Sequence, residues 1–297
     1  PIAVVFMLGR FTGRRALTPF VFVTMLVLSL ASIGAAGWSE AQPNAAVAES
    51  AASGSNMEGK EVRFGASASA LWAAATTQTS NGSVNSMHDS LNPVAGAVTI
   101  SNMLVNGIWG GIGCGLVNFF VYVLAAVFLA GLMIGRTPEL FGRKLETGEI
   151  RLLSAVVLLQ PLLMLTATAI ALSVPGLAGT SNPGFHGVAQ VFYEYTSAYA
   201  NNGSGFEGLA DATPWWNLSC VVLLLAGRYG CLLIPLAIAG RLAAKRVAPE
   251  TSSTLRIETP TFGLTLIAVI ALLTLLCFLP VLMLGPIGEG LSLAAAR

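Results

Sequence analysis

The chain has 297 residues, of which 55% are hydrophobic and only 10% charged, and its formal net charge is +1. Its mean hydropathy is +0.75. This composition predicts an all-α integral membrane protein, and a net charge so close to zero argues against a nucleic-acid partner and against a polybasic docking surface.

The first 15 residues resemble the end of an apolar helix followed by a short basic loop. Arg14 and Arg15 precede an apolar run, as in a twin-arginine export signal, but four further apolar runs follow. We therefore favour a fragment whose N-terminal part is absent. Five stretches are long enough to cross a bilayer as helices: 16–37, 90–135, 152–174, 213–240 and 261–284.

The basic residues predict the orientation. If successive loops alternate between the two sides, eleven Lys and Arg fall on one side and three on the other, while Arg228 lies inside a span. The side with more positive charge is expected to be cytoplasmic. The outer loops are acidic, which fits either a vestibule that concentrates cations or an ordinary solvated loop face.

Two largely apolar stretches, 64–79 and 188–200, are too short to span and end in the same tripeptide, Asn-Gly-Ser. A helix of 14 residues extends about 21 Å, against about 30 Å of hydrocarbon. Such a segment enters the membrane and turns back, and irregular backbone at that depth must line a cavity or be buried in protein. Because rings of backbone carbonyls bind dehydrated cations, the turns predict an ion pathway.

The order of span, outer loop, short helix, polar turn and span occurs twice, with the two turns 121 residues apart. A closed carbonyl ring needs about four such units, supplied by a second chain or by an absent N-terminal part. The alternative for each segment alone is an interfacial helix with an ordinary turn. Duplication in matching positions favours the filter, for which the candidate carbonyls belong to Ser80, Asn81, Gly82, Asn201, Asn202 and Gly203.

Glycines interrupt the uncharged run 90–135 at its centre, in the sequence Gly-Gly-Ile-Gly-Cys-Gly. Each glycine costs a helix about 1 kcal/mol relative to alanine, which favours two half-helices joined by a loop at membrane depth. The alternative is close helix packing through a small-xxx-small pair. The residues of this candidate gate loop are Gly110, Gly111, Gly113, Cys114 and Gly115.

Arg228 is the only formal charge within the stretch 213–240, about 12 residues from either end. An arginine at that depth costs on the order of 3 kcal/mol, so we expect it to face the protein interior or water. It is either a structural residue bound to carbonyls at a helix break, or a coupling residue whose positive charge repels a cation descending from the filter.

Several longer motifs resemble one family, the potassium-binding subunit of the Kdp potassium-transporting P-type ATPase. The motifs are Asn-Met-Glu-Gly-Lys-Glu at 56–61, Met-His-Asp-Ser at 87–90, Gly-Leu-Met-Ile-Gly-Arg-Thr-Pro-Glu at 131–139, Asn-Pro-Gly at 182–184 and Thr-Ser-Ala at 196–198. The resemblance implies potassium-channel-like membrane-pore-membrane repeats with re-entrant pore helices. This chain would then be the C-terminal half.

On this resemblance the regions are 1–15, the end of a preceding repeat; 16–151, the third repeat; 152–258, the fourth repeat; and 259–297, an extra C-terminal helix. K⁺ would pass from the outer filter through an intramembrane tunnel to a P-type catalytic subunit, with a single-span subunit alongside, in the bacterial inner membrane. ATP hydrolysis would lie on the partner. Asn106 stands where the family often has an acidic residue, which puts a charge at that position in doubt.

Three other functions stay open on the sequence. A stand-alone channel-like cation transporter would use the same turns. An intramembrane hydrolase would need His186 or Asp211 to complete a site with His88, Asp89 and Ser90, since adjacent residues cannot form a triad. A non-transporting fragment product is the third. The four cysteines lie in apolar stretches without a Cys-x-x-Cys pair, so we expect free, buried thiols.

Overall fold

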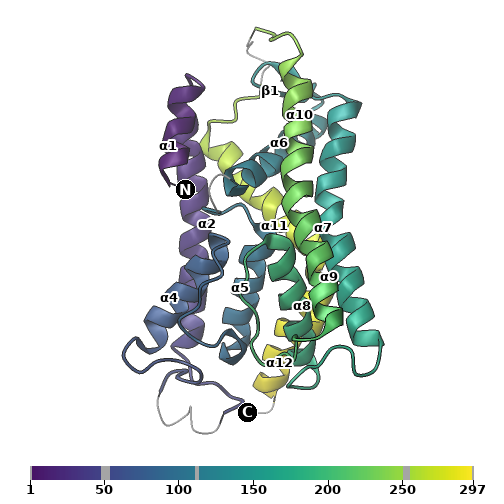
Figure 1. Ribbon diagram of the computed structural model, residues 1–297. Coiled ribbons are helices and arrows are strands. Elements are labelled where there is room, and N and C mark those ends of the chain that lie inside the picture. The colour runs from purple at the N-terminus through teal and green to yellow at the C-terminus, as the bar shows by residue number, and fades with distance from the viewer. Residues whose placement is uncertain (1, 48–53, 111–113, 250–254, 296–297) are drawn as a thin grey trace.

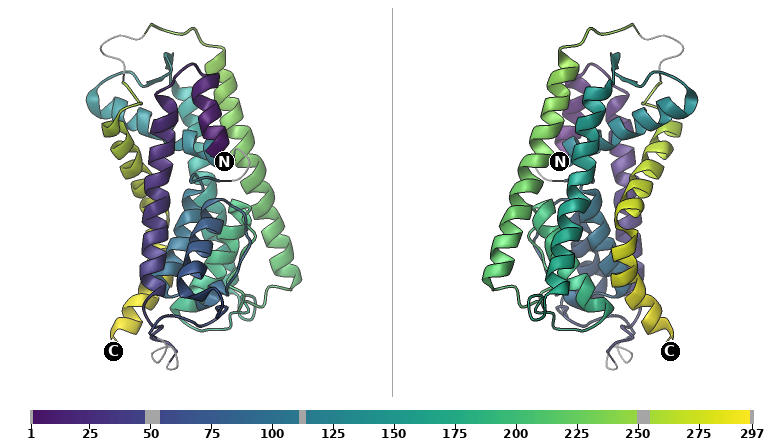
Figure 2. Two further views of the ribbon diagram at one scale, coloured as in Figure 1. Left: turned by 90° about the vertical axis from the view of Figure 1, so that its left-hand side faces the viewer. Right: turned by 90° about the vertical axis from the view of Figure 1, so that its right-hand side faces the viewer.

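The computed structural model of the chain describes residues 2–47, 54–110, 114–249 and 255–295. Within these ranges the protein is a helical bundle with one short antiparallel hairpin, β1 (Glu139–Leu140) and β2 (Arg143–Lys144). Most of the long helices run roughly along one axis, whereas the helix of residues 114–134 is strongly inclined to it, and the hairpin and the C-terminal helix lie at opposite ends (Figures 1 and 2).

The chain enters through α1 (Ile2–Phe11), which packs on the first long helix, α2 (Leu17–Glu40). A 14-residue helix, α4 (Gly65–Gln78), and the short 3₁₀ helix η1 (His88–Ser90) follow. Next comes α5 (Pro93–Val105), and after a break the chain continues as α6 (Cys114–Ile134). The predicted interruption of the 90–135 run is therefore confirmed. The helices α2, α4 and α5 pack on one another.

The same order of elements is found a second time. The long helix α7 (Thr147–Ser173) is followed by the 16-residue helix α8 (Phe185–Ala200) and by α9 (Pro214–Leu225). A π-helical turn, η2 (Ala226–Gly230), joins α9 to α10 (Cys231–Ala243). Both α5 and α9 begin with proline in the first turn, where its missing N–H has no helical partner to lose.

The chain ends in α11 (Pro260–Leu282), a second π-helical turn, η3 (Met283–Ile287), and α12 (Gly288–Ala295). The helix α11 packs against α2, α5 and α6. It therefore covers the first unit, here the run of helices α2 to α6, while the second unit is the run α7 to α10. The helix α8 is highly enclosed, with 11 of its 16 residues buried, Tyr193 and Tyr195 among them. A helix buried on all sides can hold the turn that follows it in a fixed place.

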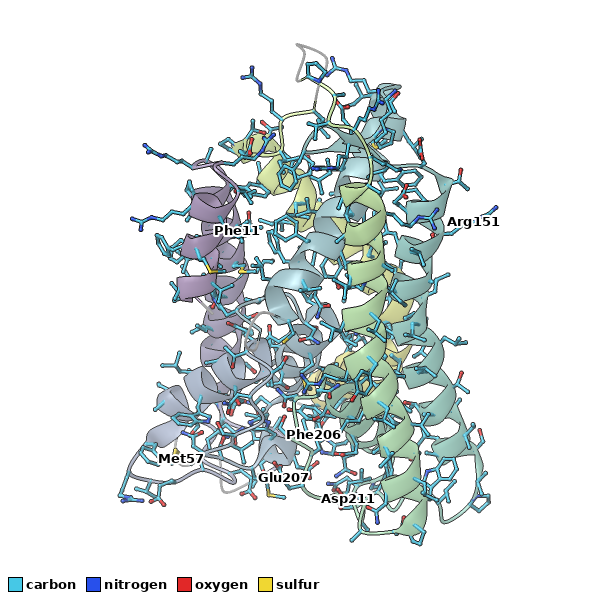
Figure 3. The ribbon with its side chains drawn as sticks, turned by 45° about the horizontal axis from the view of Figure 1, so that its top comes forward. Phe11, Met57, Arg151, Phe206, Glu207 and Asp211 are labelled. Atoms are coloured by element: carbon cyan, nitrogen blue, oxygen red, sulfur yellow. The ribbon has the colours of Figure 1, made fainter. Side chains whose placement is uncertain are left out.

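Five helices are long and apolar enough to cross a membrane, which confirms the prediction of a multi-pass membrane protein: Leu17–Glu40, Cys114–Ile134, Thr147–Ser173, Pro214–Ala243 and Pro260–Ala295. Figure 3 shows Phe11 and Arg151 at one end of the bundle, here called the basic end, and Met57, Glu207 and Asp211 at the other, the acidic end. Both short helices, α4 and α8, lie in the half of the bundle at the acidic end (Figure 1).

Candidate functional site

The two Asn-Gly-Ser turns, residues 80–83 and 201–204, begin in the same unusual conformation. Ser80 has φ 51° and Asn201 has φ 54°, both in the left-handed region. The glycine two residues later also has positive φ in each turn, 78° and 99°. A non-glycine residue pays on the order of 1 kcal/mol for the left-handed conformation, so its occurrence at equivalent positions indicates a shared structural requirement.

The hydrogen bonds of the two turns also match. Asn81 donates its backbone N–H to the carbonyl of Thr76 at 3.2 Å, and Asn202 donates to the carbonyl of Ser197 at 3.0 Å. In both turns the asparagine Oδ1 accepts the backbone N–H of the serine two residues later, at 3.0 Å. The two turns therefore match in a backbone bond and in a side-chain bond.

The two turns touch each other. A Cβ atom added at Gly82 would collide with the backbone carbonyl of Asn202, so only glycine fits there. From the other side, Asn202 Nδ2 donates to the Thr76 carbonyl at 3.2 Å. Residues that are far apart in the chain thus form one continuous backbone surface.

Carbonyl groups at these turns are left open. Among the hydrogen bonds between described residues, none ends on a carbonyl oxygen of residues 80–82 or 201–203. Of these residues Asn202 is buried, Ser80, Gly82 and Asn201 are half-buried, and Asn81 and Gly203 are exposed on this chain. Carbonyls that accept no protein donor are able to receive an ion.

Beneath the first turn, the break between α5 and α6 begins at Asn106, which is left-handed with φ 44°. Ser80 Oγ donates to Asn106 Oδ1 at 2.6 Å. The Asn106 carbonyl accepts from Asn118 Nδ2 at 2.9 Å, which replaces a helical bond lost at the break. Asn106 is therefore in direct contact with the candidate filter.

The candidate gate loop is only partly described. Gly110 and Gly115 lie so close that a Cβ on either would meet the backbone of the other, and Gly115 N donates to the Gly110 carbonyl at 2.8 Å. Cys114 is the first residue of α6. Gly111 and Gly113 lie outside the described residues.

Beneath the second turn, Arg228 lies in the π-helical turn η2, and its Nε donates to Asn201 Oδ1 at 3.1 Å. The backbone approaches closely here too, because a Cβ at Gly227 would collide with the carbonyl of Tyr199. The side chain of Arg228 is exposed on this chain. π-Helical turns are rare and are often found at functional sites.

The family model of the potassium-transporting ATPase A subunit matches residues 1–291. This chain belongs to that family. It is 50% identical over its whole length to the potassium-transporting ATPase potassium-binding subunit of Gloeobacter violaceus, covering 52% of that protein. It is 48% identical over 99% of its length to the protein of the same name from Geobacillus kaustophilus, covering 53%. The chain thus spans about half the length of these relatives.

At the acidic end of the bundle, His186 on α8 contacts one carboxylate from η1 and one from α12. Its Nε2 lies 2.9 Å from Asp89 Oδ1, and its Nδ1 lies 2.8 Å from Glu289 Oε1. Burial disfavours the charged ring, but the bonds to the two carboxylates outweigh it and raise the pKa of His186 to about 9. With both nitrogens bonded to carboxylates, His186 has no lone pair to act as the base of a hydrolase.

A second chain of contacts was not found from the sequence. The buried His88 ring lies 2.9 Å from the Tyr193 hydroxyl through Nδ1, and that hydroxyl lies 2.8 Å from Ser204 Oγ. Ser204 Oγ in turn donates to Asn202 Oδ1 at 2.6 Å. Burial and the Lys60 ammonium lower the pKa of His88 to about 4, so its ring is neutral. The sequence singles out His88 through the Met-His-Asp-Ser motif, but it does not predict the contacts with Tyr193 and Ser204.

The acidic outer loops divide into two groups. Glu40 forms a fully buried ion pair with Lys60 at 2.8 Å, and Asp89 is bonded to His186. Both carboxylates are engaged within the protein, Glu40 by Lys60 and Asp89 by a His186 ring that it shares with Glu289. Glu207 follows the second turn in the chain, and its carboxylate accepts the His88 backbone N–H at 3.0 Å. Loss of solvent around this carboxyl raises its pKa despite the N–H groups that it accepts.

Proposed function

We propose that this chain forms part of the potassium-binding and translocating subunit of an ATP-driven potassium uptake complex. Its two turns supply two sides of an outer K⁺ filter. In this proposal K⁺ is coordinated by backbone carbonyls of Ser80, Asn81, Gly82, Asn201, Asn202 and Gly203, and the rest of a four-sided ring comes from outside this chain.

One observation carries the proposal. Two turns of the same geometry meet at Gly82 and Asn202, and no donor among the described residues binds the carbonyl oxygens of 80–82 and 201–203. Carbonyl rings of this kind replace the hydration shell of K⁺ in channels. The names of the relatives, potassium-binding subunits, agree with this use of the site.

Below the filter, we infer that the loop of Gly110, Gly111, Gly113, Cys114 and Gly115 acts as a gate and that K⁺ leaves sideways through a tunnel. A small cavity of about 50 Å³ lies between the two runs of helices, lined mainly by apolar side chains and also by Asn106, Asn118, Gln160 and Tyr199. In this proposal its polar side chains mark the start of the path. The Arg228 guanidinium, bonded to the second turn, would repel a descending cation and favour that exit.

The proposal places the protein in the bacterial inner membrane, with lipid around its apolar faces, a P-type ATPase catalytic subunit as its energy source and a single-span subunit as a further partner. The regions 16–151 and 152–258 are then the third and fourth membrane-pore-membrane repeats, between the end of a preceding repeat (1–15) and the extra helix (259–297).

The test replaces the two filter glycines in the intact complex and measures K⁺ uptake in a strain without other potassium transporters. In Gly82→Ala the new Cβ collides with the Asn202 carbonyl and the φ of 78° is strained, so K⁺ affinity should fall about tenfold or more. In Gly203→Ala the Cβ has open space and only the φ of 99° is strained, so the loss should be smaller.

Gly34→Ala is the matched control, because a Cβ at Gly34 in α2 meets nothing within 4 Å and its backbone is helical. It should leave affinity and selectivity against Na⁺ unchanged. Parental affinity and selectivity in both Gly82→Ala and Gly203→Ala would refute the filter assignment.

A further inference from the structure

We propose that the helix break beneath each turn holds that turn in its ion-binding shape. Asn106 is the positioning residue for the first turn, through Ser80, and Arg228 is the positioning residue for the second, through Asn201. The proposal rests on the filter function above and adds to it the residues that determine filter geometry from below.

The first residue of each turn has a backbone conformation that its surroundings must stabilise. Ser80 and Asn201 occupy the same place in the two turns, and both are left-handed without being glycine. Backbone of this kind persists only when its surroundings fix it. The carbonyls that follow in each turn can point at one ion only if this first residue keeps its φ.

A side-chain hydrogen bond holds each of these residues. Ser80 bonds to Asn106, 26 positions later, and Asn201 Oδ1 accepts from Arg228, 27 positions later. Asn201 Nδ2 also donates to the carbonyls of Tyr199 and Leu224, at 3.0 and 3.3 Å. Both partners lie where the following helix departs from regular α geometry, Asn106 in a left-handed helix end and Arg228 in a π-helical turn. The chemistry differs, since Asn106 accepts and Arg228 donates, but the position of the bond is the same.

Contacts with neighbouring helices also fix the two helix breaks in place. Asn118 Nδ2 donates to the Asn106 carbonyl at 2.9 Å, and Gln160 Nε2 on α7 donates to the Leu104 carbonyl at 2.9 Å. In the second unit, Gly227 lies against the Tyr199 carbonyl. A break fixed by its own neighbours can hold the turn above it. A movement of the α5–α6 break must therefore shift the first turn as well.

The first unit is tested by a double-mutant cycle in the intact transport complex. Ser80→Ala and Asn106→Ala each place alanine at positive φ, and the cycle removes that common strain from the interaction energy. Each single variant should lower K⁺-over-Na⁺ selectivity by about three- to tenfold, the effect of one hydrogen bond. The double variant should lose less selectivity than the sum of the two single losses, because the one hydrogen bond is removed only once.

Two further variants test the bond between Ser80 and Asn106 if an alanine variant fails to assemble. Ser80→Gly removes the hydroxyl without left-handed strain and should lose selectivity, because the bond to Asn106 is gone. Asn106→Asp keeps an acceptor and tolerates positive φ, so it should retain selectivity. The added charge acts alike on K⁺ and Na⁺, since both carry one positive charge.

The second unit allows a closely matched pair of variants at one position. In Arg228→Gln the new amide nitrogen is separated from Cα by the same number of bonds as the arginine Nε, so it can still donate to Asn201. Arg228→Met has a similar length and no donor. The glutamine variant should keep parental selectivity, whereas the methionine variant should lose about three- to tenfold.

Thr168→Ala is the control, because it removes a buried hydroxyl that bonds within α7, to the Met164 carbonyl, and it should leave selectivity unchanged. Additive effects of Ser80→Ala and Asn106→Ala, or parental selectivity in Arg228→Met, would overturn the proposal. Gly82→Ala in the same assay distinguishes the filter assignment from the positioning roles of Asn106 and Arg228. If Gly82→Ala is the only variant that changes selectivity, the filter assignment stands and the positioning roles fail. If no variant changes selectivity, the filter assignment fails.

Discussion

At the scale of single residues, His186 should give the protein a measurable dependence on alkaline pH. Its pKa is raised from 6.5 to about 9 in the folded state by Asp89 and Glu289, against the opposing effect of burial. The stabilisation is therefore complete below pH 6.5 and is lost as pH rises through 9. The difference corresponds to about 3 kcal/mol of unfolding free energy.

Thermal unfolding of the detergent-solubilised complex between about pH 6 and about pH 10 measures this effect. The parent should lose stability towards the alkaline end relative to His186→Asn, which has no titrating ring. A constant difference between the two proteins across this range would contradict the charged His186. His88 has the opposite sign, because its lowered pKa costs stability only as pH falls from 6.5 towards 4.

Single residues also divide into those that the sequence could predict and those it could not. The two turns were predictable because Asn, Gly and Ser carry a local signal for positive φ and tight turns. The contacts of Ser80 with Asn106 and of Asn201 with Arg228 join residues 26 and 27 positions apart, and no local pattern encodes such a bond. The place of Arg228 within the apolar stretch 213–240 predicts that it faces protein or water. It bonds to Asn201 while its side chain remains exposed.

At the scale of elements, the two helix breaks differ in how readily they could be predicted. Glycines at 110, 111, 113 and 115 made the break between α5 and α6 visible, because glycine destabilises a helix wherever it occurs. The η2 turn contains only Gly227 and Gly230 and keeps helical hydrogen bonding, so the stretch 213–240 was predicted as one continuous span. A π-helical turn changes which backbone N–H and C=O groups bond to each other, but it leaves the hydropathy of the stretch unchanged.

The break between α5 and α6 leads to a prediction about K⁺ leakage through the protein. Deleting part of the candidate gate loop, residues 110–115, should open a K⁺ leak that needs no ATP, because the irregular backbone at that depth would no longer close the path below the filter. Flux through the reconstituted complex without ATP is the measurement. Deleting the exposed loop residues Ala45 and Ala46 is the control and should leave the membrane tight. A tight membrane after both deletions would favour a packing role for the glycines.

At the scale of the whole molecule, the positive charge of Arg228 should couple ion movement to ATP hydrolysis on the partner. Arg228→Gln keeps a donor for Asn201 but removes the charge that directs K⁺ sideways. It should retain K⁺ binding and K⁺-stimulated ATP hydrolysis while K⁺ uptake per ATP falls severalfold. Both rates are measured on the same reconstituted complex. Parental uptake per ATP in a fully assembled Arg228→Gln complex would leave Arg228 a positioning role only.

A heavy monovalent cation is the most direct way to locate a K⁺ site formed by the two turns together. Tl⁺ has nearly the ionic radius of K⁺ and scatters anomalously. In an experimental structure of the intact complex with Tl⁺ in place of K⁺, we expect an anomalous peak between the first turn (80–82) and the second turn (201–203). A peak elsewhere, or none at the turns in a complex that transports Tl⁺, would contradict the account.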